Sequence, residues 1–187
     1  MKTNGTTGKI GKIGIAGAGG IGSNVARYLA QADVKHIRVV DFDRVETSNL
    51  NRQFYGAAQV GRPKVKCLRD NLRQIYPAMD VEVVHHRLTP GDSLDIFGDC
   101  CLVVEGFDNA AAKKILVEEM SAAGIPLVCA SGIAGRDMSG VIVRQIAGCH
   151  IVGDFVTGLD DGELFPPKVG MIAAMMAGIV LDLVEQM

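Results

Sequence analysis

A glycine-rich turn between an apolar strand and a helix is the feature that most constrains the fold of this chain. Residues 12–30 read KIGIAGAGGIGSNVARYLA, in which Gly17, Gly19 and Gly22 fill a GxGxxG pattern and Gly20 is an additional glycine. Such glycines allow a tight turn and a close approach of the backbone to a phosphate, and the helix that follows presents its N-terminal amide groups to the anion. The segment predicts a nucleotide-binding turn, although a tight turn without a ligand would explain the glycines alone.

A second apolar strand strengthens the nucleotide interpretation. Residues 37–43 read IRVVDFD, and Asp41 lies 19 positions after Gly22. An acidic residue about 20 positions beyond such a turn accepts hydrogen bonds from the ribose hydroxyls. Asp41 is therefore predicted to hold a ribose, which suits an NAD-dependent dehydrogenase as well as other nucleotide-binding proteins.

Apolar runs alternate with helical patterns along the whole chain. Strands are expected at residues 13–19, 37–43, 81–87, 101–107, 126–132 and 140–146, and helices near residues 21–32, 61–76, 93–98, 109–123 and 168–185. This alternation predicts an α/β fold with a Rossmann-like, mainly parallel sheet and helices on both faces. Ligands of such sheets bind beyond the carboxyl ends of the strands, where the glycine turn, Asp41 and the turn at residues 105–109 would meet.

Composition favours one domain over residues 1–187, with a flexible start at residues 1–9. The chain is 48% hydrophobic and its net charge is −2, so nucleic acid and acidic membranes are not expected as partners. Residues 1–8 lack the apolar stretch of a signal peptide, and the five cysteines, an odd number, indicate reduced thiols in a cytoplasmic protein.

The most apolar segment, residues 169–181, is expected to be a buried helix. It is shorter than the roughly 20 apolar residues that a bilayer requires, and Lys168 precedes it. Gly170, Ala174 and Gly178 recur at every fourth residue and give one smooth helix face. This face could contact a second subunit, or it could pack within the subunit.

Two cations and a carboxylate are more than a dehydrogenase requires. Arg52 follows SNLN, Lys64 lies in VGRPKV just before a helix, and Asp108 lies in VVEGFDN. Nucleotidyl transfer depends on positioning and on neutralising phosphate charge with cations and a carboxylate-held Mg²⁺. Taken singly, Arg52 and Lys64 could be surface charges and Asp108 could cap the following helix.

Taken together and in this order, the segments GAGGIG, VVDFD, SNLNRQ, VGRPK, FDN and PPKVG resemble the ThiF/MoeB family of ubiquitin-activating-like enzymes. The resemblance runs from about Lys12 to Gly170. It implies an adenylyltransferase that binds ATP and Mg²⁺ and adenylates the C-terminal glycine carboxylate of a ubiquitin-like sulfur carrier ending in Gly-Gly, with release of pyrophosphate.

The resemblance also implies roles for individual residues. Gly17, Gly19, Gly20 and Gly22 would cradle the nucleotide, Asp41 would hold the ribose, Asn49, Arg52 and Lys64 would meet the phosphates, and Asp108 would hold Mg²⁺. Arg52, Lys64 and the metal would offset the repulsion between the attacking carboxylate and the α-phosphate. No general base is needed, because a terminal carboxyl group with a pKa of about 3.3–3.7 is already ionised.

This sequence lacks cysteines that longer family members carry, which changes what is expected of its metal content and catalytic residues. Those members carry two CxxC pairs that bind zinc, whereas the matching place here holds only Cys149, so zinc is not expected. Residues 153–167 contain no cysteine, and no catalytic cysteine is assigned; Cys149 is interpreted as a small buried residue at a strand end. The outline resembles the short ThiF subgroup, which acts on the carrier ThiS in making the thiazole of thiamine, and a homodimer is expected.

Other functions stay open at this point. They are adenylation of another carrier, such as the MoaD type used for molybdopterin, a non-catalytic nucleotide-binding module that docks a carrier, and an NAD-dependent oxidoreductase. The last lacks an evident acid or base for hydride transfer, and Arg52 and Lys64 have no natural role beside a nicotinamide. Lys113 is assigned no function.

Overall fold

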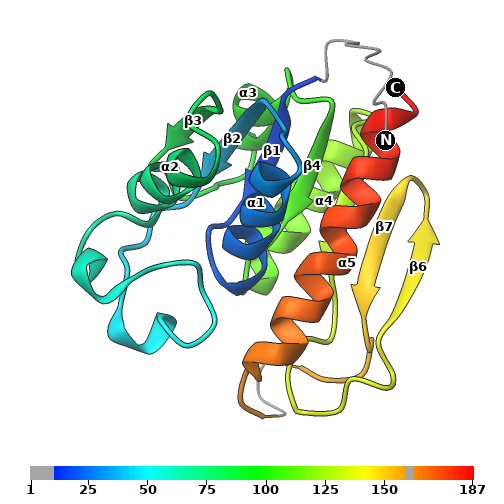
Figure 1. The fold of residues 1–187 in the computed structure, drawn as a ribbon. Coiled ribbons are helices and arrows are strands. Elements are labelled where there is room, and N and C mark those ends of the chain that lie inside the picture. The colour runs from blue at the N-terminus through cyan, green and yellow to red at the C-terminus, as the bar shows by residue number, and fades with distance from the viewer. Residues whose placement is uncertain (1–10, 159–161) are drawn as a thin grey trace, which may run out of the picture.

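The computed structural model describes residues 11–158 and 162–187. Within them, seven strands form one sheet in the order β3-β2-β1-β4-β5-β7-β6 (Figure 1). They are β1 (Ile13–Ala16), β2 (His36–Val40), β3 (Asp80–Val84), β4 (Leu102–Glu105), β5 (Leu127–Ala130), β6 (Ile142–Ile146) and β7 (Cys149–Gly153). All neighbouring strands are parallel except β6 and β7, which are antiparallel. The predicted mainly parallel α/β sheet is confirmed.

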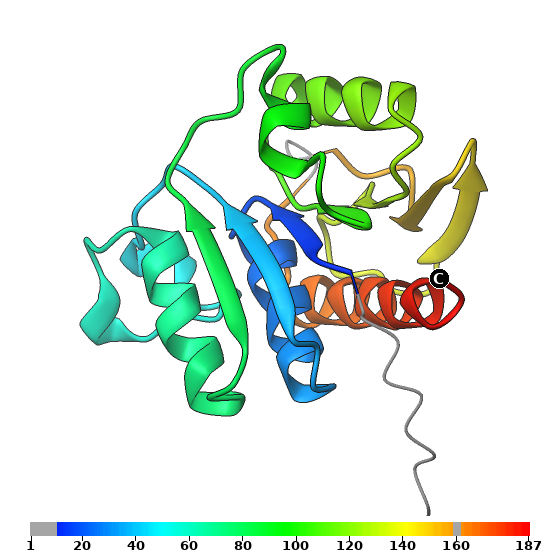
Figure 2. The ribbon, with the colours of Figure 1, turned by 90° about the horizontal axis from the view of Figure 1, so that it is seen from above.

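Helices cover both faces of this sheet. One face carries α1 (Gly20–Gln31), α2 (Lys64–Ile75) and α5 (Pro166–Glu185), and the other carries α3 (Asp92–Phe97) and α4 (Ala110–Ala122) (Figure 2). Two short 3-10 helices, η1 (Thr47–Asn49) and η2 (Ala57–Gln59), lie between β2 and α2. The sheet is thus the middle of three layers, which explains why its central strands read as continuous apolar runs.

Alternate residues of β1 pack into the two cores. Ile13 and Ile15 belong to the core on the side of α1, α2 and α5, and Ala16 belongs to the core on the side of α3 and α4. A Cβ atom added to Gly14 would lie 2.7 Å from Phe97 Cδ1. The glycine therefore allows α3 to approach the sheet closely.

Strand β1 lies where the strand order reverses. Ile13 is in register with Ile37 of β2 on one side and with Leu102 of β4 on the other. The chain moves outward from β1 to β3 and then crosses back to β4, so the connections leave β1 and β4 in opposite directions. Such a reversal opens a crevice at the carboxyl ends of the strands.

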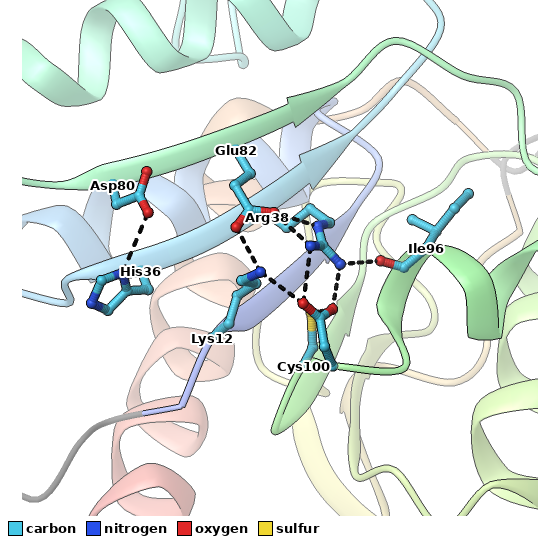
Figure 3. A network of polar contacts seen from close by, with 8 residues as sticks. Lys12, His36, Arg38, Asp80, Glu82, Ile96 and Cys100 are labelled. Carbon is cyan, nitrogen blue, oxygen red and sulfur yellow. Dashed lines mark hydrogen bonds and ion pairs between the residues drawn. The ribbon is translucent and has the colours of Figure 1, made fainter.

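A network of four charged side chains covers part of the sheet face on the side of α3 (Figure 3). Lys12 Nζ lies 2.6 Å from Glu82 Oε1 and 2.8 Å from Asp99 Oδ2. Arg38 Nη2 lies 2.6 Å from Glu82 Oε2, and its Nη1 donates to Asp99 and to the carbonyl oxygen of Ile96. Two cations and two carboxylates thereby join β1, β2 and β3 to the turn after α3.

Helix α5 packs on the sheet as a core helix. It has 20 residues and is long and apolar enough, by length and composition, to cross a membrane. In the structure it lies beside α1 and along β5 and β7 (Figure 1), and Ile172, Met176 and Val180 are wholly buried. The expected buried helix is confirmed, although it begins at Pro166 rather than Lys168.

The small-residue face of α5 points away from this core. Ala174 and Gly178 are exposed and Gly170 is half-buried. In the part of the chain that the structure describes, no heavy atom lies within 4 Å of a Cβ added to Gly170 or Gly178. Packing within the subunit therefore does not explain these small residues.

Two local expectations differ from the structure. The sequence missed β7, which follows β6 through a turn at Ala147 and Gly148, both with positive φ (47° and 80°). Helix α2 begins at Lys64 rather than residue 61, because Pro63 has non-helical backbone angles (φ −56°, ψ 129°) and serves as its N-cap. The expected flexible start at residues 1–9 lies outside the described residues.

Candidate functional site: a nucleotide cavity at the strand ends

A cavity of about 420 Å³ lies beyond the carboxyl ends of β1, β2, β4 and β5. Gly17 follows β1, Asp41 follows β2, Gly106 follows β4 and Ser131 follows β5, and all four line it. Ligand sites commonly have volumes of about 300–1,000 Å³. The cavity therefore has the size and the position that the fold predicts for a nucleotide.

The glycine turn forms one part of the cavity wall. Gly17, Gly19 and Gly20 line the cavity, and Gly17 has a φ of +92° with its missing Cβ only 2.8 Å from the carbonyl oxygen of Gly106. Gly19 is the N-cap of α1 and provides no side chain to cap the first turn. The first-turn amides are thus available to an anion.

Gly22 has a different role from the one expected. It does not line the cavity, and a Cβ at this position would lie 1.8 Å from the carbonyl oxygen of Gly17. Its absent side chain lets α1 pack under the turn. Gly22 thus shapes the turn from outside the cavity lining.

Asp41 joins the glycine turn to the end of β2. Its Oδ2 accepts from the amide of Ala18 at 2.6 Å, and its Oδ1 accepts from the amide of Asp43 at 2.7 Å. Burial raises the pKa of Asp41, while these two backbone bonds oppose the rise. Each oxygen retains acceptor capacity, so Asp41 can fix the turn and also bind ribose hydroxyls.

Arg52 is held at the cavity with part of its guanidinium group unpaired. The side-chain amide of Asn24 donates to the carbonyl oxygen of Arg52 at 2.8 Å, and Arg52 Nη1 donates to the carbonyl oxygen of Ser48 at 2.8 Å. Arg52 Nε and the neighbouring Gln53 Oε1 are buried and have no hydrogen-bond partner within residues 11–158 and 162–187. Both residues line the cavity, and unpaired buried polar atoms at such a place fit a polar ligand.

Lys64 reaches the same cavity from the first turn of α2. Its Nζ lies 2.9 Å from Asp43 Oδ2, and its backbone amide donates to the carbonyl oxygen of Asp43 at 2.9 Å. The lysine side chain is only 8% exposed. Asp43 therefore orients a lysine that has further protons for a phosphate, and the surface-charge alternative for Lys64 is wrong.

Asn49 organises the loop before Arg52. Its Oδ1 accepts from the amide of Glu46 at 3.1 Å, and its carbonyl oxygen accepts from the amides of Arg52 and Gln53. Asn49 is buried and does not line the cavity. The structure thus places it behind Arg52 rather than against the expected phosphates.

Asp108 lines the cavity with an exposed side chain. The N-cap of α4 is Asn109, whose Oδ1 accepts from the amides of Ala111 and Ala112 at 2.9 and 3.0 Å. The alternative that Asp108 is the cap is therefore wrong. Its carboxylate fits Mg²⁺, which typically uses one or two carboxylates together with phosphate oxygens. Nowhere in residues 11–158 and 162–187, this cavity included, do three His, Cys, Asp or Glu side chains converge on a metal site.

Lys113 is a cavity residue that the sequence interpretation missed. Its Nζ donates to Glu105 Oε2 and to the carbonyl oxygen of Ala130, both at 2.6 Å. Glu105 is wholly buried, which raises its pKa, and Lys113 opposes that effect. The sequence indicated that a cation was needed here, because Glu105 ends an apolar strand and a buried carboxylate requires a partner. It did not indicate which cation.

Cys149 does not line the cavity. It begins β7, is 7% exposed, and its Sγ lies 3.3 Å from Sγ of Cys129 in β5. Both are free thiols. The interpretation of Cys149 as a small buried residue at a strand end is confirmed.

Fold and site together are those of a nucleotide-binding α/β protein. Its cavity presents an arginine, a lysine and a helix N-terminus, which are groups that suit phosphates. The sequence profile of the ThiF family matches residues 9–187, and the chain belongs to this family. It is 32% identical over 167 residues to the probable adenylyltransferase/sulfurtransferase MoeZ of Mycobacterium tuberculosis, covering 88% of this chain and 41% of that protein. It is 30% identical over 164 residues to the molybdopterin-synthase adenylyltransferase of Escherichia coli, covering 84% of this chain and 66% of that protein.

Solved structures agree with the fold. The tRNA N6-threonylcarbamoyladenosine dehydratase TcdA of E. coli, in complex with AMP, superposes with a TM-score of 0.85 at 22% identity, covering 94% of this chain and 86% of that chain. At this identity the likeness establishes the architecture alone. The chain also spans only 41% of the length of MoeZ, so this similarity covers less than half of that protein.

Proposed function

We propose that this protein adenylates the C-terminal glycine carboxylate of a ubiquitin-like sulfur carrier, using MgATP and releasing pyrophosphate. The observation that carries the proposal is the unpaired, buried Nε of Arg52 at the cavity. Lys64 and Asp108 line the same cavity. Relatives named adenylyltransferases support the reaction class.

In the proposed reaction, a carboxylate oxygen of the carrier attacks the α-phosphorus of ATP. The bond from that phosphorus to the bridging oxygen breaks, and pyrophosphate leaves with the electron pair. Arg52, Lys64 and the first-turn amides of α1 bind the phosphates and offset the charge of two approaching anions. Asp108 would hold Mg²⁺, which when bound neutralises phosphate charge. The attacking carboxylate is already ionised, so no side chain has to remove a proton.

For the carrier, we propose the ThiS type and hence a role in thiamine thiazole synthesis. The support is the resemblance to the short ThiF subgroup. The similarity to the molybdopterin-synthase adenylyltransferase of E. coli makes a MoaD-type carrier the second candidate. Carriers of both types present the same C-terminal glycine carboxylate, so their KM values in the same assay distinguish the two candidates.

We further propose a cytoplasmic homodimer. Its support is the exposed small-residue face of α5, where Gly170 and Gly178 have open space beyond them. On the edge strand β6, Ile142 and Ile146 are 45% and 59% exposed. Light scattering at working concentration tests the dimer, and a monomer alone would contradict it.

The test of the reaction is ATP–pyrophosphate exchange with purified protein, Mg²⁺ and carriers of the ThiS and MoaD types. Exchange that requires a carrier supports the proposal, and the carrier with the lower KM is the preferred substrate. Arg52→Ala should reduce exchange, with Arg44→Ala, another arginine of the same connection that lies outside the cavity lining, as the control. ATP binding without exchange on any carrier would favour a docking module, and NAD-stimulated reduction would favour an oxidoreductase.

A further inference from the structure

A lysine is completely buried at the start of α5. Lys168 has 0% exposure and is the third residue of the helix, after Pro166 and Pro167. A cation is unfavourable near a helix N-terminus, and a buried charge is costly unless it is paired. A buried lysine at this position therefore needs partners close by, and its neighbour Val169 lines the nucleotide cavity.

Lys168 is paired by groups from two other segments of the chain. Its Nζ donates to the carbonyl oxygen of Ala134 at 2.5 Å, after β5, and to Asp154 Oδ2 at 2.7 Å, after β7. One ammonium group thus ties α5 to the connections that leave both of these strands.

Asp154 extends the same set of contacts. Its Oδ1 accepts from the amides of Val156 and Thr157 at 2.8 and 2.9 Å, and its Oδ2 accepts from Thr157 Oγ1 at 2.8 Å. Burial opposes the ionisation of Asp154, but Lys168 and these donors outweigh it and hold the pKa of its carboxyl group well below the ordinary value. Asp154 is therefore ionised in this pair, and its side chain is only 11% exposed.

The carboxylate also packs against the backbone of the cavity wall. Gly132 has a φ of +76°, and a Cβ at this position would lie 1.9 Å from Asp154 Oδ1. The amide of Asp154 donates to the carbonyl oxygen of Gly132 at 3.2 Å. Gly132, Ile133, Thr157 and Val169 all line the cavity, so one ion pair joins the segments that form this part of its wall.

This part of the wall differs from the part that would hold the nucleotide. The groups suited to phosphate, ribose and Mg²⁺ lie on the glycine turn, the ends of β2 and β4, the loop that carries Arg52 and the start of α2. The wall tied to Lys168 offers small and aliphatic residues, such as Gly132, Ile133 and Leu164. Two substrates must meet in one cavity, and this wall is the surface left for the second.

We infer that Lys168 and Asp154 form a positioning pair, which fixes the acceptor side of the cavity so that an extended tail of small residues reaches the α-phosphate. The inference rests on the proposed adenylation. Neither residue touches the reacting atoms; both act through the segments 131–135 and 154–158. Loosening these segments would weaken their hold on the carrier tail, and lost binding of a substrate raises its KM.

The test compares Lys168→Met with the double variant Lys168→Met/Asp154→Asn. The single variant leaves a buried carboxylate unpaired and lowers stability, and the double variant removes that charge and regains stability. The asparagine side chain of the double variant would keep an acceptor for the two amides, while the tie from α5 to Ala134 is lost in both variants. In both, the KM for the carrier should rise about 10-fold, while the KM for ATP stays within about twofold.

Lys12→Met is the matched control, because it removes a lysine from the charge network on the sheet face of Figure 3. It should lower stability and leave both KM values unchanged. An unchanged carrier KM in the folded double variant would overturn the inference, as would an equal rise in the KM for ATP. A carrier KM that recovers together with stability in the double variant would show a purely structural pair.

A second readout separates this inference from the proposed reaction. Amide hydrogen exchange of residues 131–135 and 154–158 should quicken in the double variant and not in Lys12→Met, and the affinity for ATP should stay within about twofold. If the unaltered protein shows no pyrophosphate exchange, the proposed reaction fails while this readout still decides whether the pair orders the wall. Unchanged amide exchange in both segments would refute the inference whatever the reaction.

Discussion

Lys113 Nζ lies 2.6 Å from Glu105 Oε2, and that carboxyl group is completely buried at the end of β4. The other carboxyl oxygen accepts from the amide of Phe107 at 2.8 Å. Lys113 also donates to the carbonyl oxygen of Ala130, so one side chain joins the ends of β4 and β5 at the cavity. This ion pair thus stabilises the part of the cavity lining at the ends of β4 and β5.

Replacing Lys113 with methionine should leave Glu105 buried without its cation. We expect the free energy of unfolding to fall by about 3–5 kcal/mol. The folded-state pKa of Glu105, already raised by burial, would rise further, so the folded variant binds more protons than the unfolded chain. Its stability should therefore fall as pH rises above about 4.3, the unfolded value. Denaturant unfolding from pH 4 to 8 measures this, and Glu105→Gln added to Lys113→Met should remove the slope.

Asp108 and Asn109 are adjacent but should respond to alanine in different ways. Asn109→Ala removes the cap of α4 and should lower stability by about 1 kcal/mol. Asp108→Ala should change stability by less than about 0.5 kcal/mol, yet lower Mg²⁺-dependent pyrophosphate exchange by about 10²-fold. Thermal unfolding and exchange assays on the two variants check this. Equal loss of exchange in both would contradict a metal role for Asp108.

Two helical glycines should also differ sharply. Gly22→Ala would place Cβ 1.8 Å from the carbonyl oxygen of Gly17, so we expect a loss of about 3 kcal/mol or more and a weakened affinity for ATP. Gly170→Ala meets no heavy atom of its own subunit within 4 Å among the described residues and should stabilise α5 of the isolated subunit by about 0.5–1 kcal/mol. Unfolding curves and ATP titrations of the two variants provide the comparison. A Gly22→Ala protein with normal ATP affinity would show that the turn tolerates distortion.

The charge network of Lys12, Arg38, Glu82 and Asp99 should make stability depend on acid. Hydrogen bonds from Arg38 and Lys12 lower the pKa of Asp99 to about 2, and Lys12 and Arg38 also hold the pKa of Glu82 below its ordinary value despite its burial. The unfolded chain therefore binds more protons in this range, so stability is lost as pH falls from about 5 towards 2.

Asp99→Asn should flatten this part of the pH profile. Asp95→Asn alters an exposed carboxylate of α3 outside the network and should leave the profile unchanged. Urea unfolding midpoints between pH 3 and 7 give the measurement. Parallel profiles for the unaltered protein and Asp99→Asn would show that the network does not titrate as the geometry implies.

Local patterns in the sequence predicted most of the fold. The glycine turn, the apolar strands and the switch from strand to helix patterns are short-range signals, and they located β1 to β6 and all five α-helices. Strand β7 was missed because Ala147 and Gly148 do not form one of the common hairpin-turn pairs such as Asn-Gly, and because Cys149–Gly153 is short. Only its pairing with β5 and β6 reveals it.

The candidate site was predictable where a motif specified the residue. Arg52, Lys64 and Asp108 do line one cavity, and Asp41 lies beside them. The lysines at 113 and 168 were not recognised, because their partners are Glu105, Ala130, Ala134 and Asp154, and only the three-dimensional structure brings these groups together. Asn49 and Gly22 occupy positions of the motifs but do not line the cavity. Asn49 stabilises the loop that holds Arg52, and Gly22 allows the tight glycine turn.

The bond from the Ala18 amide to Asp41 fixes the glycine turn to the end of β2 through groups of the protein itself. A nucleotide would then meet donors that are fixed in place, and binding would order little of the protein, which reduces its entropic cost. The sugar would contact the same carboxylate that holds the turn. A ligand lacking both ribose hydroxyls should consequently lose those contacts alone, and its phosphates should find an unaltered turn.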